Sequence, residues 1–358
     1  MQMKGMLLAL LCSVFSPAAL AQEWKAGEQH GTTALPSAGV RDAQQRDTLR
    51  FTVWYPAPAS SNETPLTIGT PDAPLFDVGR SAIGAPIAGD RLPTLLLSHG
   101  NGGSARMMGW LGTALARAGY LVIAVDHPGN NGADDMTLAG SMLTWLRADD
   151  LQAALAAVQA DPRLGPHVDG QRLGVVGFSA GGYTALLAAG ARPELQRLWD
   201  FCTGHPDDGV CRPQQEAPTH TLQARQQAAA SRQLQPYMAA ADQSRAISGV
   251  RAVYLLAPAI VQAFAPAQLQ ALRQPISIVL GDADAVAPLA TNGEVLAAQV
   301  PGATLLRLAG VGHYDFLSSC TPLGEQRIGP LCSGTVPRSR THRQAEAEAV
   351  AFFGRVLK

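Results

Sequence analysis

Short apolar runs recur along most of the chain, and each of them ends at residues typical of turns. Runs with few interspersed polar residues are typical of parallel strands that are covered on both faces. The pattern predicts such strands over 94–98, 120–125, 172–177, 250–256, 275–280 and 304–308. An earlier segment, 49–55, alternates between apolar and polar residues, which predicts a strand with one solvated face.

Helical patterns lie between several of these predicted strands. Segment 105–118 carries apolar residues at helical spacing, 143–160 is rich in Ala and Leu, and 342–358 forms a third helical pattern. Since strands and helices alternate, we expect an α/β fold with a doubly wound, mostly parallel sheet. The sequence contains no visible internal repeat.

Two segments interrupt this alternation. Residues 57–91 are rich in Pro, Gly and Ser, and we expect irregular structure there with room for one strand. Residues 192–248 form a long polar insertion dominated by Gln and Ala. We expect this insertion to form a helical cap over the carboxyl ends of the strands, where open α/β sheets bind ligands. The alternative is a solvated loop that has no contact with the ligand site.

The composition excludes several classes of protein. With 27 basic and 28 acidic side chains the formal net charge is −1, so no electrostatic footprint for nucleic acid is visible. Gly and Pro are spread along the chain, which argues against a disordered or collagen-like protein. Beyond the N-terminal segment no apolar run reaches the length of a membrane span. A globular α/β protein of 358 residues remains.

The N-terminus has the features of a secretory signal peptide. A basic residue precedes an apolar core over 6–15, and Ala19 and Ala21 supply the two small residues of a cleavage site. We therefore expect cleavage after residues 1–21, which leaves a single domain over 22–358 in a periplasmic or secreted protein. A short buried helix at the terminus is the alternative.

Cysteine usage agrees with export. Four cysteines remain after that cleavage, and four cysteines allow three disulfide connectivities. The close spacing within each pair favours Cys202–Cys211 and Cys320–Cys332. Two disulfides fit an oxidising compartment. A zinc site is the alternative, but neither pair has the C-x2-C spacing that is typical of zinc sites.

One motif carries most of the chemical information: Gly177-Phe178-Ser179-Ala180-Gly181-Gly182. A buried strand leads into it and an Ala/Leu-rich helix leads out, which is the setting of a nucleophile elbow. Such a turn strains the backbone of the serine, and small residues around it let strand and helix approach closely. The helix N-terminus also favours an anion that develops beside Ser179. We expect Ser179 to be a nucleophile; the alternative is a serine that only caps the helix.

A serine nucleophile needs a base, which in this type of site follows an acid in the chain. Four histidines follow Ser179. We expect His313 to be the base, because its glycine-rich loop directly follows the last predicted strand at the same edge of the sheet as the elbow. His205 and His220 lie in the insertion, and we expect His342 to cap or pack the C-terminal helix.

The candidates for the orienting acid can be reduced by exclusion. No Asp or Glu lies between Pro258 and Gly281, which excludes an acid directly after the strand predicted over 250–256. The next predicted strand ends in a loop that contains Asp282 and Asp284. We expect Asp284, which lies deeper in that loop, to orient the base and Asp282 to lie in a surface turn.

A tetrahedral intermediate on such a serine needs hydrogen-bond donors for its oxyanion. One is the backbone N–H of Ala180, and our candidate for the second is the N–H of Asn101 in the glycine-rich loop after the strand over 94–98. We expect His99 in that loop to be structural. No phosphate-binding loop or dinucleotide fingerprint is present, and the Asp and His residues over 126–135 lack ligand partners at the right spacing. We therefore expect no cofactor and no metal.

These residues together resemble the α/β-hydrolase superfamily, and more narrowly the dienelactone-hydrolase-like and platelet-activating-factor-acetylhydrolase-like serine hydrolases. The similarity rests on segments 53–56, 98–103, 126–130, 177–182, 281–288 and 312–313 and on the final helix. It implies an α/β-hydrolase fold with Ser179 as nucleophile, Asp284 as acid and His313 as base. It also implies backbone donors at Asn101 and Ala180. Dienelactone hydrolases use a cysteine nucleophile, so the serine at position 179 argues against that activity.

The expected function is that of an exported serine hydrolase that cleaves a small-molecule carboxylic ester through an acyl-enzyme. An ester is favoured over an amide because the sequence has no feature that would read a peptide. An exported serine peptidase or amidase with the same three residues is the first alternative. An inactive binding protein on a hydrolase scaffold is the second.

Overall fold

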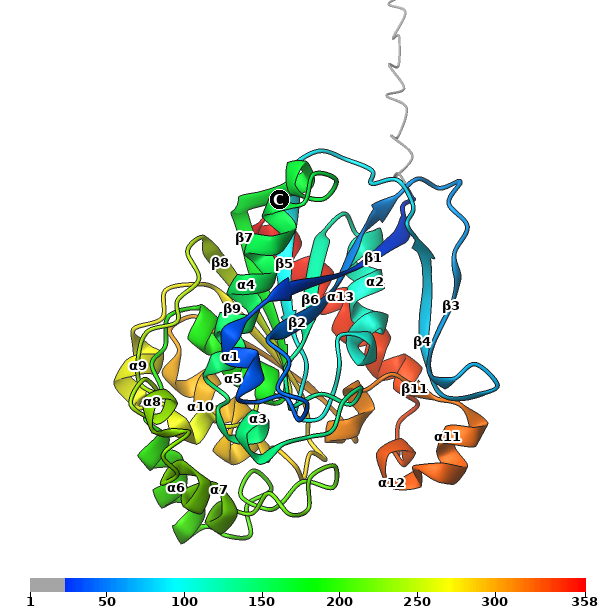
Figure 1. Ribbon diagram of the computed structural model, residues 1–358. Helices are drawn as coiled ribbons and strands as arrows, with labels where there is room; N and C mark the ends of the chain where they lie inside the picture. The colour runs from blue at the N-terminus through cyan, green and yellow to red at the C-terminus, as the bar shows by residue number, and fades with distance from the viewer. Residues whose placement is uncertain (1–22) are drawn as a thin grey trace, which may run out of the picture.

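The computed structural model describes residues 23–358, and the expected signal peptide lies outside this range (Figure 1). The strands are β1 (Lys25–Ala34), β2 (Thr48–Ala57), β3 (Thr64–Thr70), β4 (Ala73–Ile83), β5 (Leu92–Ser98), β6 (Leu121–Asp126), β7 (Val168–Phe178), β8 (Val250–Leu256), β9 (Ile276–Gly281), β10 (Thr304–Leu308) and β11 (Ser319–Cys320). They form one sheet in the order β10-β9-β8-β7-β5-β6-β2-β1-β4-β11, with β3 paired to β4. All neighbours from β10 to β6 are parallel.

The six apolar runs correspond to β5 through β10, and their parallel pairing confirms the predicted fold class. The prediction of a solvated face on β2 is wrong. Residues 51–57 are all buried, because β2 lies between β1 and β6 and packs against helices on both faces. Segment 57–91 holds a hairpin of two strands, β3 and β4, instead of largely irregular structure.

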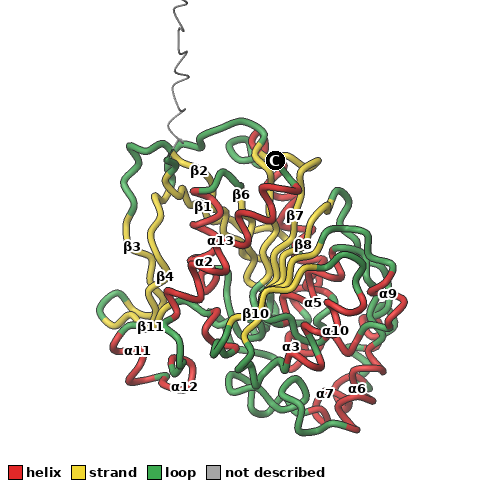
Figure 2. Tube along the Cα trace, turned by 180° about the vertical axis from the view of Figure 1, so that it is seen from behind, coloured by secondary structure: helices red, strands yellow, loops and turns green. Residues whose placement is uncertain are grey.

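Helices cover both faces of the sheet, as Figure 2 shows from behind. The cluster of apolar side chains on one face includes α2 (Gly109–Arg117) and α13 (Arg338–Val356). The cluster on the other face includes α4 (Leu146–Ala160), α5 (Ala180–Ala188) and α10 (Gly293–Gln299). Shorter helices are α1 (Pro36–Gly39), α3 (Leu138–Met142) and α9 (Pro266–Gln270), with 3-10 turns η1 (Arg106–Met108), η2 (Gly165–His167), η3 (Val261–Ala263), η4 (Leu289–Thr291) and η5 (His313–Phe316).

The ends of α4 and α13 show how local sequence sets the helices. The residue before a proline avoids the helical region, and Asp161 accordingly leaves α4 with extended backbone angles just before Pro162. Helix α13 begins at Arg338, four residues before the predicted start, so His342 lies inside it. His342 is buried, stacks on Trp110 and bonds the backbone oxygen of Leu317 through Nε2 at 2.8 Å. Among the described residues, no helix combines the length and the hydrophobicity that a membrane span requires.

The insertion over 192–248 contains α6 (Leu195–Gly204), α7 (Leu222–Ala229) and α8 (Gln235–Met238); α6 and α7 lie at the lower end of the molecule in Figure 1, and α8 lies higher, beside α9. A disulfide between Cys202 and Cys211, with Cα atoms 5.1 Å apart, joins α6 to the loop that follows it. A second disulfide, Cys320–Cys332, joins β11 to α12 (Gly329–Cys332) beyond α11 (Pro322–Arg327). Both pairings are the ones that the cysteine spacing favours.

Candidate active site

Ser179 lies in a sharp turn between β7 and α5. Its backbone angles, φ 54° and ψ −120°, fall in a region that L-residues rarely occupy. A Cβ atom at Gly177 would overlap the backbone of Gly181, and one at Gly181 would overlap the backbone of Ser98. The small residues of the motif therefore permit the close approach of strand, turn and helix that the strained serine requires.

The side chain of Ser179 does not cap α5. Its Oγ lies 2.8 Å from Nε2 of His313, and Nδ1 of His313 lies 2.7 Å from Oδ2 of Asp284. With the Nδ1 proton donated to Asp284, Nε2 is free to accept the hydroxyl proton of Ser179. Ser179 and Asp284 lie in the turns that follow β7 and β9, and His313 is the first residue of η5; each has less than a tenth of its surface exposed.

The second oxygen of Asp284 is also fixed. Its Oδ1 accepts hydrogen bonds from the backbone N–H groups of Val286 and Ala287, at 2.9 and 2.7 Å. Asp282, by contrast, is exposed, and its carboxylate accepts a hydrogen bond from the backbone N–H of Gly310 at 2.7 Å. The structure therefore brings Asp284, and not Asp282, to His313.

The other histidines after Ser179 lie elsewhere. His205 is exposed at the end of α6, and His342 is packed in α13 as described above. His220 bonds the hydroxyl of Ser141 at 2.8 Å. Burial holds the pKa of His220 below its usual range, and the charge of Arg225 lowers it further. None of these rings has a hydrogen bond to Ser179.

The loop that follows β5 lies against the elbow. A Cβ at Gly100 would come within 3.0 Å of the ring of Phe178 and 3.1 Å of the Cβ of Ser179, so glycine lets the loop approach the elbow without displacing these side chains. Neither the N–H of Asn101 nor that of Ala180 donates to another group within residues 23–358. His99 is buried in the same loop, where its Nδ1–H donates to the backbone oxygen of Gly100. Burial holds the pKa of His99 far below its usual range, so the ring is neutral.

A series of hydrogen bonds holds the side chain of Asn101. Its Nδ2 donates to Oε1 of Glu216 in the insertion at 2.7 Å, and its Oδ1 accepts from Nδ2 of Asn130 at 2.8 Å. Asn130 accepts in turn from Arg147 at 2.7 Å, and Arg147 also donates to the backbone oxygen of His99. Burial lowers the pKa of Arg147 to about 9. This series fixes the loop that carries the candidate oxyanion donor.

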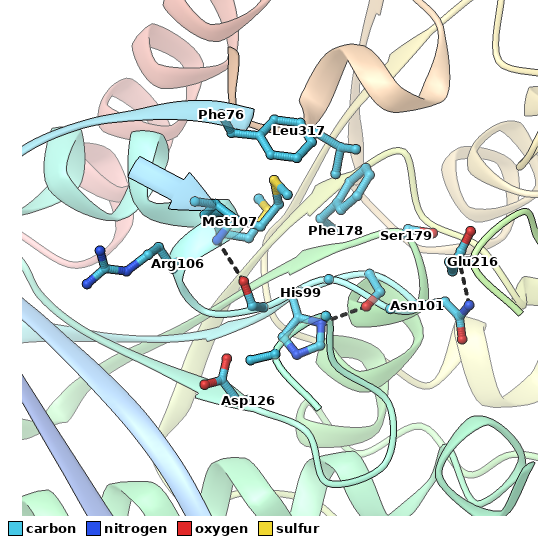
Figure 3. Close-up of a pocket in the computed structure, with 18 of the residues that line it drawn as sticks. Phe76, His99, Asn101, Arg106, Met107, Asp126, Phe178, Ser179, Glu216 and Leu317 are labelled. Carbon is cyan, nitrogen blue, oxygen red and sulfur yellow. Dashed lines mark hydrogen bonds between the residues drawn. The ribbon is translucent and has the colours of Figure 1, made fainter. Parts of the chain in front are cut away.

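A cavity of about 1000 Å³ opens at Ser179. One side of it carries Phe76, Met107 and Leu317, which face the elbow in Figure 3. His313 and Glu216 also line this large cavity. Because much of the lining is apolar, the cavity suits a bulky, apolar ligand.

A smaller cavity of about 70 Å³ lies on the insertion side of Ser179. Ala180 lines this small cavity, but His313 does not. Residues that line both cavities are Asn101, Ser179, Gln214 and Val286. The two cavities therefore meet at Ser179, and the insertion takes part in both.

Two of the acidic residues over 126–135, Asp126 and Asp134, lie beside arginines. Asp134 is 2.9 Å from Arg46 and 2.6 Å from Arg50, and these cations hold its pKa below the usual range against the effect of burial. Asp126 accepts from the backbone N–H of Ala105 at 2.8 Å and lies 3.5 Å from Arg50. Within residues 23–358 no cluster of three or more potential metal-ligating side chains is found.

The sequence of residues 95–322 matches the model of the alpha/beta hydrolase family. The chain belongs to this family. In three dimensions the α/β-hydrolase is similar to a ferulic acid esterase from Streptomyces cinnamoneus, with a TM-score of 0.58 and 20% sequence identity. This similarity covers 96% of the present chain and 92% of the esterase, and it shows a shared fold. No curated protein matches the chain.

Three side chains beside the site escape prediction from the sequence: Asn130, Arg147 and Glu216. Asn130 ends the segment 126–130, whose resemblance to the family was the one available signal. Arg147 lies in a predicted helix, and nothing in the helical pattern indicates that its guanidinium points inward. Glu216 belongs to the insertion, which carries no recognisable motif.

Proposed function

We propose that this α/β-hydrolase cleaves carboxylic esters through an acyl-enzyme, with Ser179 as nucleophile, His313 as base and Asp284 as orienting acid. The observation that carries the proposal is the hydrogen-bonded series from Ser179 to His313 to Asp284, with distances of 2.8 and 2.7 Å, at the mouth of two cavities. A strained serine, an adjacent base and an oriented ring are the parts that acyl transfer needs.

In this mechanism Ser179 attacks the ester carbonyl while Nε2 of His313 takes the hydroxyl proton. The backbone N–H groups of Ala180 and Asn101 bind the oxyanion of the tetrahedral intermediate. His313 then gives the proton to the departing alcohol, and the acyl group stays on Ser179. Water repeats the cycle, which releases the acid. Asp284 remains ionised and stabilises the imidazolium.

The proposal extends to where the protein works and how it is organised. Removal of residues 1–21 would deliver one domain over 22–358 to the periplasm or the medium, where two disulfides are stable. The insertion over 192–248 would act as a cap, since it supplies side chains to both cavities at Ser179. Two cavities of about 1000 and 70 Å³ that meet at Ser179 favour a small-molecule ester as substrate.

A panel of p-nitrophenyl esters and aminoacyl anilides tests the reaction class. We expect release of p-nitrophenol from esters and little turnover of anilides. Labelling of Ser179 by a fluorophosphonate probe, located by mass spectrometry, tests the nucleophile directly. Turnover of anilides alone would favour a peptidase, and a folded, oxidised protein that does not react with the probe would favour a binding protein.

A further inference from the structure

The small cavity contains an arginine that the catalytic steps above do not use. Arg225 lies on α7 and lines this cavity together with residues of α6 and of the loop after α3. No Asp or Glu is among the residues that line the small cavity. The cavity therefore has a cation and no counter-charge.

Arg225 differs from three other arginines of the insertion, which form ion pairs. Arg197 pairs with Glu194, Arg212 with Asp207 and Arg245 with Asp149. The guanidinium of Arg225 has no such pair within the described residues, and its Nε is buried without a hydrogen-bond partner. Burial alone accounts for the lowered pKa of Arg225, since no neighbouring acid raises it.

An unpaired guanidinium that is partly removed from water is costly, and an anionic ligand offsets that cost. A carboxylate suits it, because the planar guanidinium donates two parallel hydrogen bonds to the two oxygens. The small cavity is therefore built to receive a carboxylate close to Ser179.

The position of His313 assigns the two cavities to the two halves of an ester. The base passes its proton to the departing alcohol, so the alcohol must lie beside His313. His313 lines the large cavity and not the small one. The acyl half then enters the small cavity, beside Ala180 and Arg225.

We propose that the substrate is a half-ester of a short dicarboxylic acid, whose free carboxylate pairs with Arg225 while a bulky, apolar alcohol occupies the large cavity. This inference rests on the proposed ester hydrolysis. At roughly 10–15 Å³ for each water-sized group, the small cavity of about 70 Å³ suits the chain of a succinyl or glutaryl group. Hydrolysis transfers the OH of water to the acyl carbon and a proton to the alcohol, and it releases the dicarboxylate.

Two benzyl esters separate this proposal from general ester hydrolysis. Benzyl hydrogen glutarate carries the carboxylate, and benzyl 5-methylhexanoate carries an isopropyl group of similar shape in its place. We expect the wild type to have the higher kcat/KM for the half-ester. Arg225→Met should lower kcat/KM for the half-ester by about 10- to 100-fold, the range for a charged hydrogen bond. It should change kcat/KM for the neutral ester by less than about threefold.

The matched control is Arg232→Met, because Arg232 is an exposed arginine of the same insertion that lines neither cavity. We expect this variant to behave as the wild type. Free glutarate should inhibit hydrolysis of the neutral ester competitively in the wild type and in Arg225→Lys, but far less in Arg225→Met. Circular dichroism checks that each variant is folded.

The outcomes are distinguishable. If Arg225→Met changes both esters equally, or changes neither, the carboxylate site is refuted while ester hydrolysis stands. Wild-type preference for the neutral ester also overturns the inference. If the wild type hydrolyses neither ester and no member of the p-nitrophenyl panel, the proposed function fails, and the inference fails with it.

Discussion

Within residues 23–358, two hydrogen-bonded Ser–His–Asp series have nearly equal hydrogen-bond distances. The pocket series is Ser179–His313–Asp284, and the buried series is Ser98–His127–Asp150. In the buried series the serine Oγ lies 2.9 Å from Nε2 of the ring, and Nδ1 lies 2.8 Å from the carboxylate. The corresponding distances in the pocket series are 2.8 and 2.7 Å. Residue types and hydrogen-bond lengths therefore do not separate the two.

Their surroundings do separate them. All three side chains of the buried series have 0% exposure, and none of them lines either cavity. Arg41 forms two hydrogen bonds to Asp150, at 2.9 and 2.6 Å, and Arg147 donates to Oγ of Ser98 at 3.3 Å. Burial lowers the pKa of His127 to about 3, and cations nearby add to that effect.

Features other than a hydrogen-bonded histidine distinguish Ser179 from Ser98. Ser179 lies in a strained turn beside two cavities and two backbone N–H groups that have no acceptor within the described residues, whereas Ser98 is the last residue of β5. Ser179 lines both cavities and Ser98 lines neither, so we expect substrate access and oxyanion donors at the pocket series and not at the buried series. We interpret the buried series as a brace behind the loop that carries Asn101.

The largest expected effect comes from exchanging the two serines for alanine. Ser179→Ala should lower kcat for p-nitrophenyl esters by about 10⁴- to 10⁶-fold, because it removes the attacking oxygen. It should also abolish fluorophosphonate labelling. Ser98→Ala should keep kcat within about tenfold and lower the free energy of unfolding by about 1–3 kcal/mol, since it leaves polar neighbours unpaired. Comparable losses of kcat in both variants would break the comparison.

The acids give the next largest effect. Asp284→Asn should lower kcat by about 10⁴-fold, because the amide favours the wrong tautomer of His313. Asp282→Asn, two residues away, removes a surface acceptor for Gly310 and should stay near the wild type. Steady-state kinetics on one ester measures both variants. Equal losses would reject Asp284 as the orienting acid.

The sequence predicts the pocket series for a physical reason. The elbow of Ser179 needs small residues at fixed positions, and the absence of acids between Pro258 and Gly281 leaves two candidates in one loop. The parallel strands are predictable because burial on both faces demands nearly continuous apolar runs. The family and the fold agree with the predicted elbow and the predicted parallel strands.

Other features depend on tertiary contacts that no local pattern carries. Arg225 lies in the same Gln- and Ala-rich segment as the exposed Arg232, so only the packing of α7 reveals its position at the small cavity. Pro and Gly give the segment of β3 and β4 a weak local strand propensity, so the sequence did not predict this hairpin. The hairpin forms because β4 also pairs with β1 and β11. For the same reason the buried face of β2 could not be predicted.

A third prediction concerns the ion pair within the buried series. Asp150→Asn leaves the buried guanidinium of Arg41 without a counter-charge and should lower the free energy of unfolding by about 3–5 kcal/mol. The matched control is Asp207→Asn, because Asp207 is 94% exposed and its partner Arg212 is 60% exposed, so the loss of this pair should cost less than about 1 kcal/mol. Urea denaturation measures both. Equal effects would show that Asp150 does not brace the fold.

The buried series should also make stability depend on pH. In the unfolded chain His127 binds a proton near its ordinary pKa of 6.5, whereas burial lowers the pKa to about 3 in the folded protein. Its contribution is therefore complete above pH 6.5 and is lost as the pH falls from 6.5 towards 3, by about 1.4 kcal/mol per pH unit.

Urea denaturation at a series of pH values checks this contribution. Between pH 7.5 and pH 5, His127 alone should account for a decrease of about 2 kcal/mol in the free energy of unfolding. His127→Gln should show a shallower slope over that range, although His99 and His342 add effects of the same sign. An unchanged slope would mean that His127 is protonated in the folded protein.

The smallest expected effect lies where the two series are linked. Hydrogen bonds run from Arg147, beside Ser98, through Asn130 and Asn101 to Glu216. Glu216→Gln keeps an acceptor for Asn101 but removes its charge, which weakens that bond by about 1 kcal/mol. Only part of this change reaches the backbone N–H of Asn101, so we expect kcat for a neutral ester to fall about two- to fivefold.

The control for this last change is Glu194→Gln, because Glu194 is about half exposed on the insertion and, among the residues that the structure describes, pairs with Arg197 alone. We expect it to leave kcat unchanged. A loss in Glu216→Gln that is confined to KM would mean that Glu216 contacts the substrate rather than fixing the loop. A loss confined to kcat would mean that the hydrogen bonds from the buried series to Glu216 hold the backbone N–H of Asn101 in position. The buried series would then support catalysis at the pocket series without contacting the substrate.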